Sequence, residues 1–318
     1  MTLIIGIYVK CHALQVSDRL VSFRTIPPRT FDPLANKTIV YFARRGIVSL
    51  SAAGLAHLGG NSTDTWIAET LSGLDLSQRA ATAFGRGICH PFDVGQALEH
   101  LRVEAGAALA REPGSRVKEI IDIQVIGSQW DRRRGRMRPV ICKVTNQRTH
   151  GPFFEKLVLP RIWPPGREWA IIGSGIGFPT ARQHLRDRFR NQGGLISPEN
   201  CLTAMVDAVR SAADQHPGVI GKDCMCVHIK GATPMATVSF RPDSAYEIKT
   251  PASNRPEPIA FTPYVIARDM VAYPSLSANN MFMTVPGVDI RFEGAPPLPL
   301  SEQAAWLQSQ QRPNPPPR

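Results

Sequence analysis

The order in which strand-like and helix-like segments follow one another is the strongest constraint on this fold. Short runs rich in β-branched residues come first, and two helical patterns follow them. A hairpin, a short strand, two more helical patterns and two strands complete the series. This order suits two stacked antiparallel sheets with helices on both outer faces. We therefore predict an α+β protein built as a four-layer αββα sandwich.

The individual elements are expected where the hydrophobic period changes between two and 3.6 residues. Strands are predicted at 3–9, 14–17, 38–42, 47–50, 169–172, 225–229 and 237–240, with a hairpin over 118–147. Helices are predicted at 62–71, 94–109, 180–189 and 198–213. Ser197, Pro198 and Glu199 supply an N-cap, an N1 proline and an early acidic residue for the last helix.

The composition changes near residue 241, where proline becomes frequent. We therefore assign residues 1–240 to one domain and 241–318 to a proline-rich C-terminal extension. Segments 264–267, 281–285 and 288–292 could add strands or dock on a neighbour. The end, 313–318, is too polar and proline-rich to pack, so we expect it to be disordered.

The formal net charge of +11 would favour acidic partners if it were concentrated in one place. The densest cluster, Arg132–Arg134 with Arg136 and Arg138, lies between two strand patterns and is interpreted as a solvated hairpin turn. No aromatic residues interleave with these arginines, so no nucleic-acid partner is predicted. No apolar run approaches the roughly 18 residues of a membrane span, and no signal peptide opens the chain. We expect a cytoplasmic protein without a membrane partner.

The six cysteines are scattered, without a CxxC pair or zinc-type spacing. They are interpreted as reduced and mostly buried thiols, with no metal and no cofactor indicated. Cys224 and Cys226 are two residues apart and should share one face of a strand. His57 and His90 have no nucleophile motif beside them.

Thr2 is the first candidate for chemistry. A methionine followed by a small residue is usually removed, which would leave Thr2 as a free N-terminus at the head of a strand. A hydroxyl needs a base to become a good nucleophile, and an α-amine with a pKa of about 7.7–8.0 has a substantial neutral fraction near physiological pH. Thr2 would then supply both nucleophile and base.

Such a site also needs a cation that keeps the amine neutral and a carboxylate that holds the cation. Asp18 ends the second predicted strand, beside the start of the first, and Lys37 begins the third. All three residues can therefore meet at one end of a sheet. Taken singly, Asp18 is an ordinary turn residue and Lys37 an ordinary solvated flank.

Together, these segments resemble the proteasome β-type family and its bacterial relatives over residues 2–240. The resemblance rests on Thr2-Leu-Ile-Ile-Gly-Ile, Val16-Ser17-Asp18-Arg19, Asn36-Lys37-Thr38-Ile39 and the Ala52-Ala53-Gly54 end of a strand. It implies a catalytic role for Lys37 and an oxyanion hole formed by backbone N–H groups near Ala53 and Gly54.

Gly173-Ser174-Gly175 is similar to a Gly-Ser-Gly signature of the same family. The resemblance implies that the Ser174 hydroxyl lies near the threonine amine. The bland alternative is a glycine-rich turn between a strand and a helix. The segment matches neither a Gly-x-Ser-x-Gly nucleophile elbow nor a G-x-G-x-x-G dinucleotide fingerprint.

The sequence departs from the family pattern before the strand predicted at 225–229. Many members carry an Asp and, three residues later, a Ser that support the threonine amine. Gly218 and Gly221 occupy these places. Asp214 or Asp223 could substitute from nearby.

The resulting functional hypothesis is a threonine peptidase of a self-compartmentalising assembly. Its partners would be peptide or unfolded protein substrates, copies of the same chain in a ring, and an unidentified ATPase. Two alternatives stay open: a non-catalytic structural subunit of such a ring, and an amidase of the same N-terminal-nucleophile type that acts on a small molecule.

Overall fold

The structure is a computed structural model, and it describes most of the first 241 residues and several segments beyond them. The described residues are 2–9, 11–23, 29–32, 35, 37–76, 84–85, 92–114, 118–158, 169–190, 197–231, 235–241, 243, 260–261, 263–267, 270–272, 276–277, 284–285 and 288–292. Met1, Asn36, Cys89, His90, 281–283 and 293–318, which carried some of the predictions above, lie outside them.

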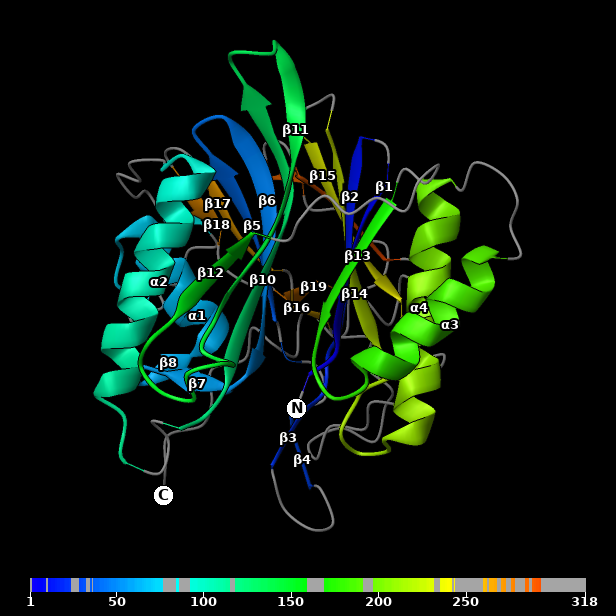
Figure 1. Ribbon diagram of the computed structural model, residues 1–318, viewed down its shortest axis with the longest axis horizontal. Coiled ribbons are helices and arrows are strands. Elements are labelled where there is room, and N and C mark those ends of the chain that lie inside the picture. Colours follow the sequence, from blue (N-terminus) through cyan, green and yellow to red (C-terminus); the bar gives the residue numbers. More distant parts are fainter. Residues whose placement is uncertain are drawn as a thin grey trace, which may run out of the picture.

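Two large sheets lie face to face between two pairs of helices (Figure 1). One sheet has the order β12 (Glu155–Val158), β11 (Arg136–Thr145), β10 (Ile121–Asp131), β6 (Gly46–Gly54), β5 (Thr38–Ala43), β17 (Tyr264–Ala267), β18 (Met270–Ala272) and β9 (Phe84–Gly85). The other has the order β13 (Trp169–Ser174), β1 (Ile4–Val9), β2 (His12–Asp18), β14 (Cys224–Lys230), β15 (Met235–Arg241), β21 (Val288–Phe292) and β20 (Thr284–Val285).

Helices α1 (Thr63–Ser72) and α2 (Val94–Ala110) cover the first sheet, and α3 (Phe178–Arg190) and α4 (Pro198–Gln215) cover the second (Figure 1). The predicted four-layer α+β fold is confirmed. Short strand pairs that were not predicted lie outside the two sheets. They are β3 (Val21–Phe23) with β4 (Arg29–Asp32), β7 (His57–Leu58) with β8 (Asn61–Ser62), and β16 (Ala260–Phe261) with β19 (Leu276–Ser277).

The buried apolar residues form three clusters, one in each space between neighbouring layers. In β1, Ile5, Ile7 and Val9 pack toward α3 and α4, whereas Tyr8 packs between the sheets. Successive side chains of a strand point to opposite faces, so both faces of β1 are apolar and both are buried. The predicted N-cap of α4 is also present, because Ser197 Oγ accepts from the Asn200 N–H at 3.1 Å.

The segments beyond residue 241 extend both sheets. β17 runs parallel to β5, and β21 runs parallel to β15, whereas the other pairings within the two large sheets are antiparallel among the described strands. The strands predicted at 264–267 and 288–292 are therefore present, and the part of 281–285 that is described pairs as β20. The division into a domain and an extension stays a prediction.

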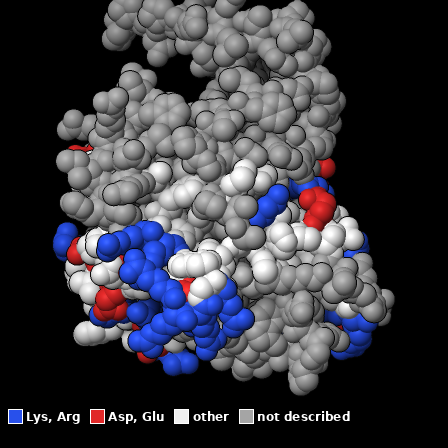
Figure 2. Space-filling view, turned by 90° about the horizontal axis from the view of Figure 1, so that it is seen from above, with Lys and Arg blue, Asp and Glu red and all other residues white. Residues whose placement is uncertain are grey.

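The arginine-rich segment is the exposed turn between β10 and β11, as predicted. Its residues Arg132–Arg134, Arg136 and Arg138 are exposed. The turn between β5 and β6, which carries the exposed Arg44, lies beside it, because the Trp130 N–H donates to Arg45 O. Figure 2 shows the resulting concentration of basic side chains on this end of the molecule. No helix among the described residues is long and apolar enough to span a membrane.

Candidate active site

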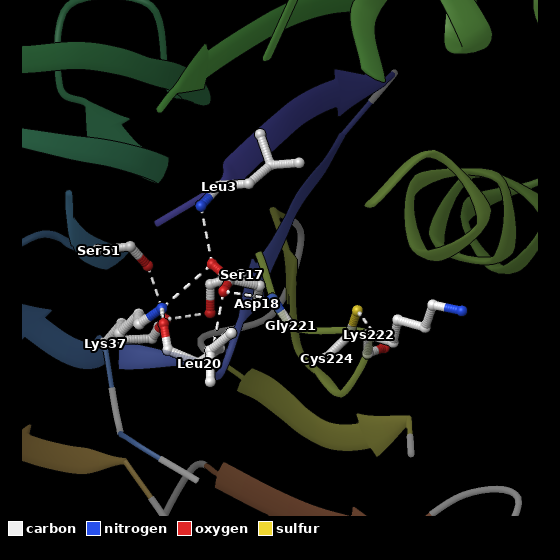
Figure 3. Close-up of polar contacts among 10 residues, drawn as sticks. Leu3, Ser17, Asp18, Leu20, Lys37, Ser51, Gly221, Lys222 and Cys224 are labelled. Carbon is white, nitrogen blue, oxygen red and sulfur yellow. Dashed lines mark hydrogen bonds and ion pairs between the residues drawn. The ribbon is translucent and has the colours of Figure 1, made fainter. Parts of the chain in front are cut away.

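The carboxylate of Asp18 is fully buried at the end of β2 and is surrounded by donors (Figure 3). Oδ1 accepts from the Leu3 N–H at 2.7 Å and from Lys37 Nζ at 3.1 Å. Oδ2 accepts from the backbone N–H groups of Leu20 at 3.2 Å and Gly221 at 3.0 Å. These charge-assisted bonds satisfy a buried charge and hold it in one orientation.

Lys37 stands immediately before β5 and is brought to Asp18 by the stacking of the two sheets. Its Nζ also donates to Leu20 O at 2.6 Å, and its side chain is 5% exposed. Asp18 and Lys37 therefore meet as predicted, but from two different sheets and not at one end of a single sheet, because β2 and β5 belong to opposite sheets of the sandwich. The pair places a buried ammonium beside the backbone that leads into β1.

Thr2 directly precedes the residue that bonds Asp18. It is 7% exposed, and the backbone of Leu3 is doubly tied to Asp18, because the Asp18 N–H also donates to Leu3 O at 3.1 Å. The backbone of Gly175 packs closely against Thr2 on the other side of the chain. A Cβ built on Gly175 would lie 1.7 Å from the Thr2 carbonyl oxygen. Both neighbours of β1 therefore fix the position of Thr2.

Ser174 ends β13, on the side of β1 opposite β2. It pairs with Ile4 in the antiparallel ladder and is 3% exposed. Its hydroxyl accepts a hydrogen bond from Lys143 Nζ at 3.0 Å. The structure thus places Ser174 opposite Ile4, two residues along the chain from Thr2, with a lysine partner that was not foreseen. The implied proximity of its hydroxyl to the Thr2 amine stays a prediction.

Ala53 and Gly54 end β6 at the same end of the sandwich. The Ala52 N–H donates to Lys37 O at 3.1 Å, which ties this strand end to the lysine. Gly54 has a φ of +107°, a conformation that favours glycine, and a Cβ there would lie 1.9 Å from Ile120 O. The strand end is therefore tightly defined, and its role as an oxyanion hole stays a prediction.

Gly221 makes a backbone contribution where the family pattern has a serine. Its N–H supports Asp18 Oδ2, and a Cβ there would lie 2.8 Å from Leu20 Cβ. The alternative carboxylates that the sequence offered are engaged elsewhere: Asp214 pairs with Lys222 at 2.7 Å, and Asp223 Oδ1 accepts from the Asp243 N–H at 2.9 Å. Among the described residues, no hydrogen bond or ion pair joins the side chain of either aspartate to Asp18 or Ser174.

Sequence reasoning missed two polar groups between the sheets. One is a chain of hydroxyls that runs from Ser17 through Thr38 and Ser51 to the Gln15 side chain. Ser17 Oγ lies 3.1 Å from Thr38 Oγ1, which lies 2.6 Å from Ser51 Oγ, and Ser51 Oγ lies 2.9 Å from Gln15 Oε1. The other is the Lys143–Asp122 ion pair, at 2.8 Å. The available signal for the ion pair was a charged residue between buried apolar neighbours in each strand, Asp122 in β10 and Lys143 in β11.

The cysteines and histidines offer no second site in the described part of the chain. Cys142, Cys201 and Cys224 are buried and unpaired, and burial raises the pKa of the Cys142 and Cys201 thiols to about 12. Cys224 and Cys226 pack on the same face of β14, as predicted. His57 is exposed on β7, and no group of three potential ligands that could hold a metal occurs among the described residues.

Comparisons with known proteins found structural similarity only, at low sequence identity. No family model matches the chain, and no curated protein matches it. Among solved structures it is similar to eukaryotic HslV from Trypanosoma brucei, with 14% sequence identity and a TM-score of 0.41. That alignment covers 72% of this chain and 99% of the HslV chain. The case for a function is therefore built on the side chains described above.

Proposed function

We propose that this chain is a threonine-type N-terminal-nucleophile hydrolase that cleaves peptide bonds with Thr2 after removal of Met1. The observation that carries the proposal is the shared oxygen of Asp18. Oδ1 binds the N–H of the residue after Thr2 and the ammonium of Lys37 at the same time. One buried carboxylate therefore fixes both the backbone directly after Thr2 and the cation.

The alternation of β1, carried beyond Ile4 to Thr2, directs the Thr2 side chain into the space between the sheets. In the proposed reaction, the free amine takes the proton of the Thr2 hydroxyl, and Oγ attacks the substrate carbonyl carbon. The Lys37 charge favours the neutral amine and stabilises developing negative charge at Oγ.

The next steps complete the turnover. Backbone N–H groups near Ala53 and Gly54 would stabilise the tetrahedral oxyanion. The protonated amine then gives its proton to the leaving amine, and an ester forms between the acyl group and Thr2. Water, with the amine again as the base, hydrolyses this ester and restores the free hydroxyl.

The proposed substrates are peptides or unfolded proteins. The proposed assembly is a ring in which identical chains lie side by side. An ATPase that delivers substrate belongs to the same hypothesis. Native mass spectrometry tests the ring directly, since a monomer at micromolar concentration would contradict it.

The chemical test is the intact mass of the purified protein with and without a peptide epoxyketone, which reacts with the hydroxyl and amine of an N-terminal threonine. We expect a chain that lacks Met1 and gains one probe, and we expect Thr2→Ala to gain none. Thr2→Ser is the matched control, because it keeps a hydroxyl and should still react. Retained hydrolysis in Thr2→Ala would sink the mechanism.

The second candidate is a non-catalytic subunit of a ring, and the glycines at 218 and 221 favour it. Neither offers a side chain to the site, and the lack of space at Gly221 leaves no place for one. Retention of Met1 with no adduct would support this candidate. Loss of Met1 with turnover of small amides but not of a peptide library would instead indicate an amidase.

A further inference from the structure

A second lysine–carboxylate pair lies on the other side of β1 from Lys37 and Asp18. Asp122 and Lys143 face the space between the sheets from β10 and β11, and their Oδ2–Nζ distance is 2.8 Å. The side chains of Asp122 and Lys143 are 10% and 14% exposed. Charges this deeply buried are costly to retain unless each is well paired.

Lys143 reaches across to the opposite sheet. Its Nζ donates to Gly173 O at 2.6 Å and to Ser174 Oγ at 3.0 Å, in addition to Asp122. An ammonium has three donors and no acceptor, so all three of its hydrogens are used. Ser174 Oγ must therefore be the acceptor, and its own hydrogen is left to point away from Lys143.

The position of Ser174 relates this contact to Thr2. Ser174 lies opposite Ile4, so Thr2 is its diagonal neighbour on the same face of the sheet, a relation in which two residues lie about 7–8 Å apart. β1 is thus flanked by a lysine-held group on each side, Asp18 from β2 and Ser174 from β13.

We propose that Lys143, held by Asp122, is a positioning residue that orients the Ser174 hydroxyl beside Thr2 and adds a second positive charge to the site. This inference rests on the function proposed above. Lys143 acts on Thr2 through Ser174 and through its field. Its ammonium lies on the Ser174 side of the ion pair, so the positive end of the pair lies beside Ser174.

The chemical consequence concerns the protonation of Thr2. A nearby cation disfavours the charged form of an amine and so favours the form that can take a proton. The other charged groups described around the start of β1 are Asp18, Lys37 and Arg19. Gly218 and Gly221 contribute no side chain, which leaves Lys143 as a source of this effect on the β13 side.

The experiment measures the rate of epoxyketone labelling by intact mass from about pH 5 to about pH 10, a range that spans the reference pKa of an α-amine. In Lys143→Met we expect the midpoint of the profile to move up by about one pH unit, which means about tenfold slower labelling below the midpoint. Lys143→Arg keeps the positive charge, so its midpoint should lie close to that of the wild type.

Lys143→Met leaves the Asp122 carboxylate buried without its partner and can therefore fail to fold. The double variant Asp122→Asn, Lys143→Met removes both charges and should, in a folded protein, move the midpoint in the same direction but by less than the single variant, in which the carboxylate remains. Lys156→Met is the matched control: Lys156 lies on the neighbouring strand β12 and pairs with Glu99 on α2 at 3.9 Å, away from Thr2. Its profile should match that of the wild type.

Two results would overturn the inference, and they are distinguishable. A wild type that labels normally, with an unchanged profile in the folded double variant, would overturn the role of Lys143 alone. A wild type that takes no probe at any pH, although Met1 is lost, would overturn the proposed function and this inference with it.

Discussion

At the scale of single residues, the backbone around Thr2 tolerates little change. Gly175 has a φ of +104° and no space for a Cβ next to the Thr2 carbonyl. Gly135, in the turn between β10 and β11, also has a positive φ, of +57°, but a Cβ there would meet nothing within 4 Å. Substitutions at the two glycines can therefore be compared. Both strain a left-handed backbone, but only the one at Gly175 also affects the contact with Thr2.

We predict that Gly175→Ala displaces Thr2 and lowers the rate of epoxyketone labelling at least about tenfold, since small misplacements of reacting atoms are costly. Gly135→Ala should keep the wild-type rate and lose only about 1–2 kcal/mol of unfolding free energy from its left-handed backbone. Labelling kinetics and urea denaturation of both variants test this. Equal labelling of the two variants would contradict the tight placement of Thr2.

His228 provides a prediction about pH and stability. Its ring lies 2.8 Å from His12, nitrogen to nitrogen, and burial, with His12 and Lys230 nearby, lowers its pKa to about 4. The unfolded chain has a His pKa near 6.5 and so binds more protons than the folded chain between about pH 4 and pH 6.5. The contribution of His228 is favourable above this window and is lost as the pH falls through it.

In urea denaturation, the unfolding free energy of the wild type should therefore fall more steeply between about pH 6.5 and pH 4 than that of His228→Gln. The difference between the two proteins is the readout, because buried carboxylates also lose stability in acid. Parallel curves for the two proteins would show that His228 is not held neutral in the fold.

At the scale of elements, the strands beyond residue 241 behave as parts of the sandwich. Tyr264, Val265 and Ile266 of β17 are 2%, 1% and 0% exposed, and they join two different core clusters. Tyr264 also bonds Thr65 of α1 through their hydroxyls, at 3.1 Å. β17 covers the edge of β5, which would otherwise present unpaired backbone groups.

Ile266→Ala should consequently lower the unfolding free energy of the whole chain by about 2–5 kcal/mol, the cost of a cavity at a fully buried site. Ile176→Ala is the matched control, because Ile176 is 48% exposed. Thermal and urea unfolding followed by near-ultraviolet circular dichroism test the pair. An unchanged main transition in Ile266→Ala would mean that the C-terminal segment folds independently of residues 1–240.

At the scale of the whole molecule, the basic surface and the candidate active site lie at opposite ends of the sheets. β10 begins at Ile121, which pairs with Gly54 near the site, and ends at Asp131 beside the arginine turn. Eleven residues of strand span about 36 Å at ~3.3 Å per residue, several times the Debye length of about 10 Å at 0.1 M salt. The arginines should therefore have no electrostatic influence on Thr2.

Replacing Arg132, Arg133 and Arg134 together by Ser should leave the rate of epoxyketone labelling within about twofold of the wild type at 0.1 M salt. The same variant should elute earlier from a cation-exchange column, since it removes exposed charge. A larger change in labelling would show that this turn communicates with the site through the fold or through a neighbouring subunit.

Much of the fold could be predicted because local patterns determine its elements. The period of two in β1 and the capped start of α4 depend only on residues close in sequence, and both are present as expected. The strand ends beside Asp18 and Lys37 could be predicted for the same reason, because each follows from a short hairpin, whereas the meeting of the two residues depends on the stacking of the two sheets. Strands that pair in parallel over a long connection, such as β17 with β5, gave no comparable local signal.

The sequence by itself therefore determined the order of strands and helices, the four layers and the residues that surround the start of β1. Only the tertiary structure decided that Lys143 crosses between the sheets to Ser174, and that the Gly221 backbone supports Asp18. Both contacts join segments far apart in the chain, and they form only when the two sheets stack in one register. That register is set by the packing of apolar side chains between the sheets, a property of the whole core and of no single segment.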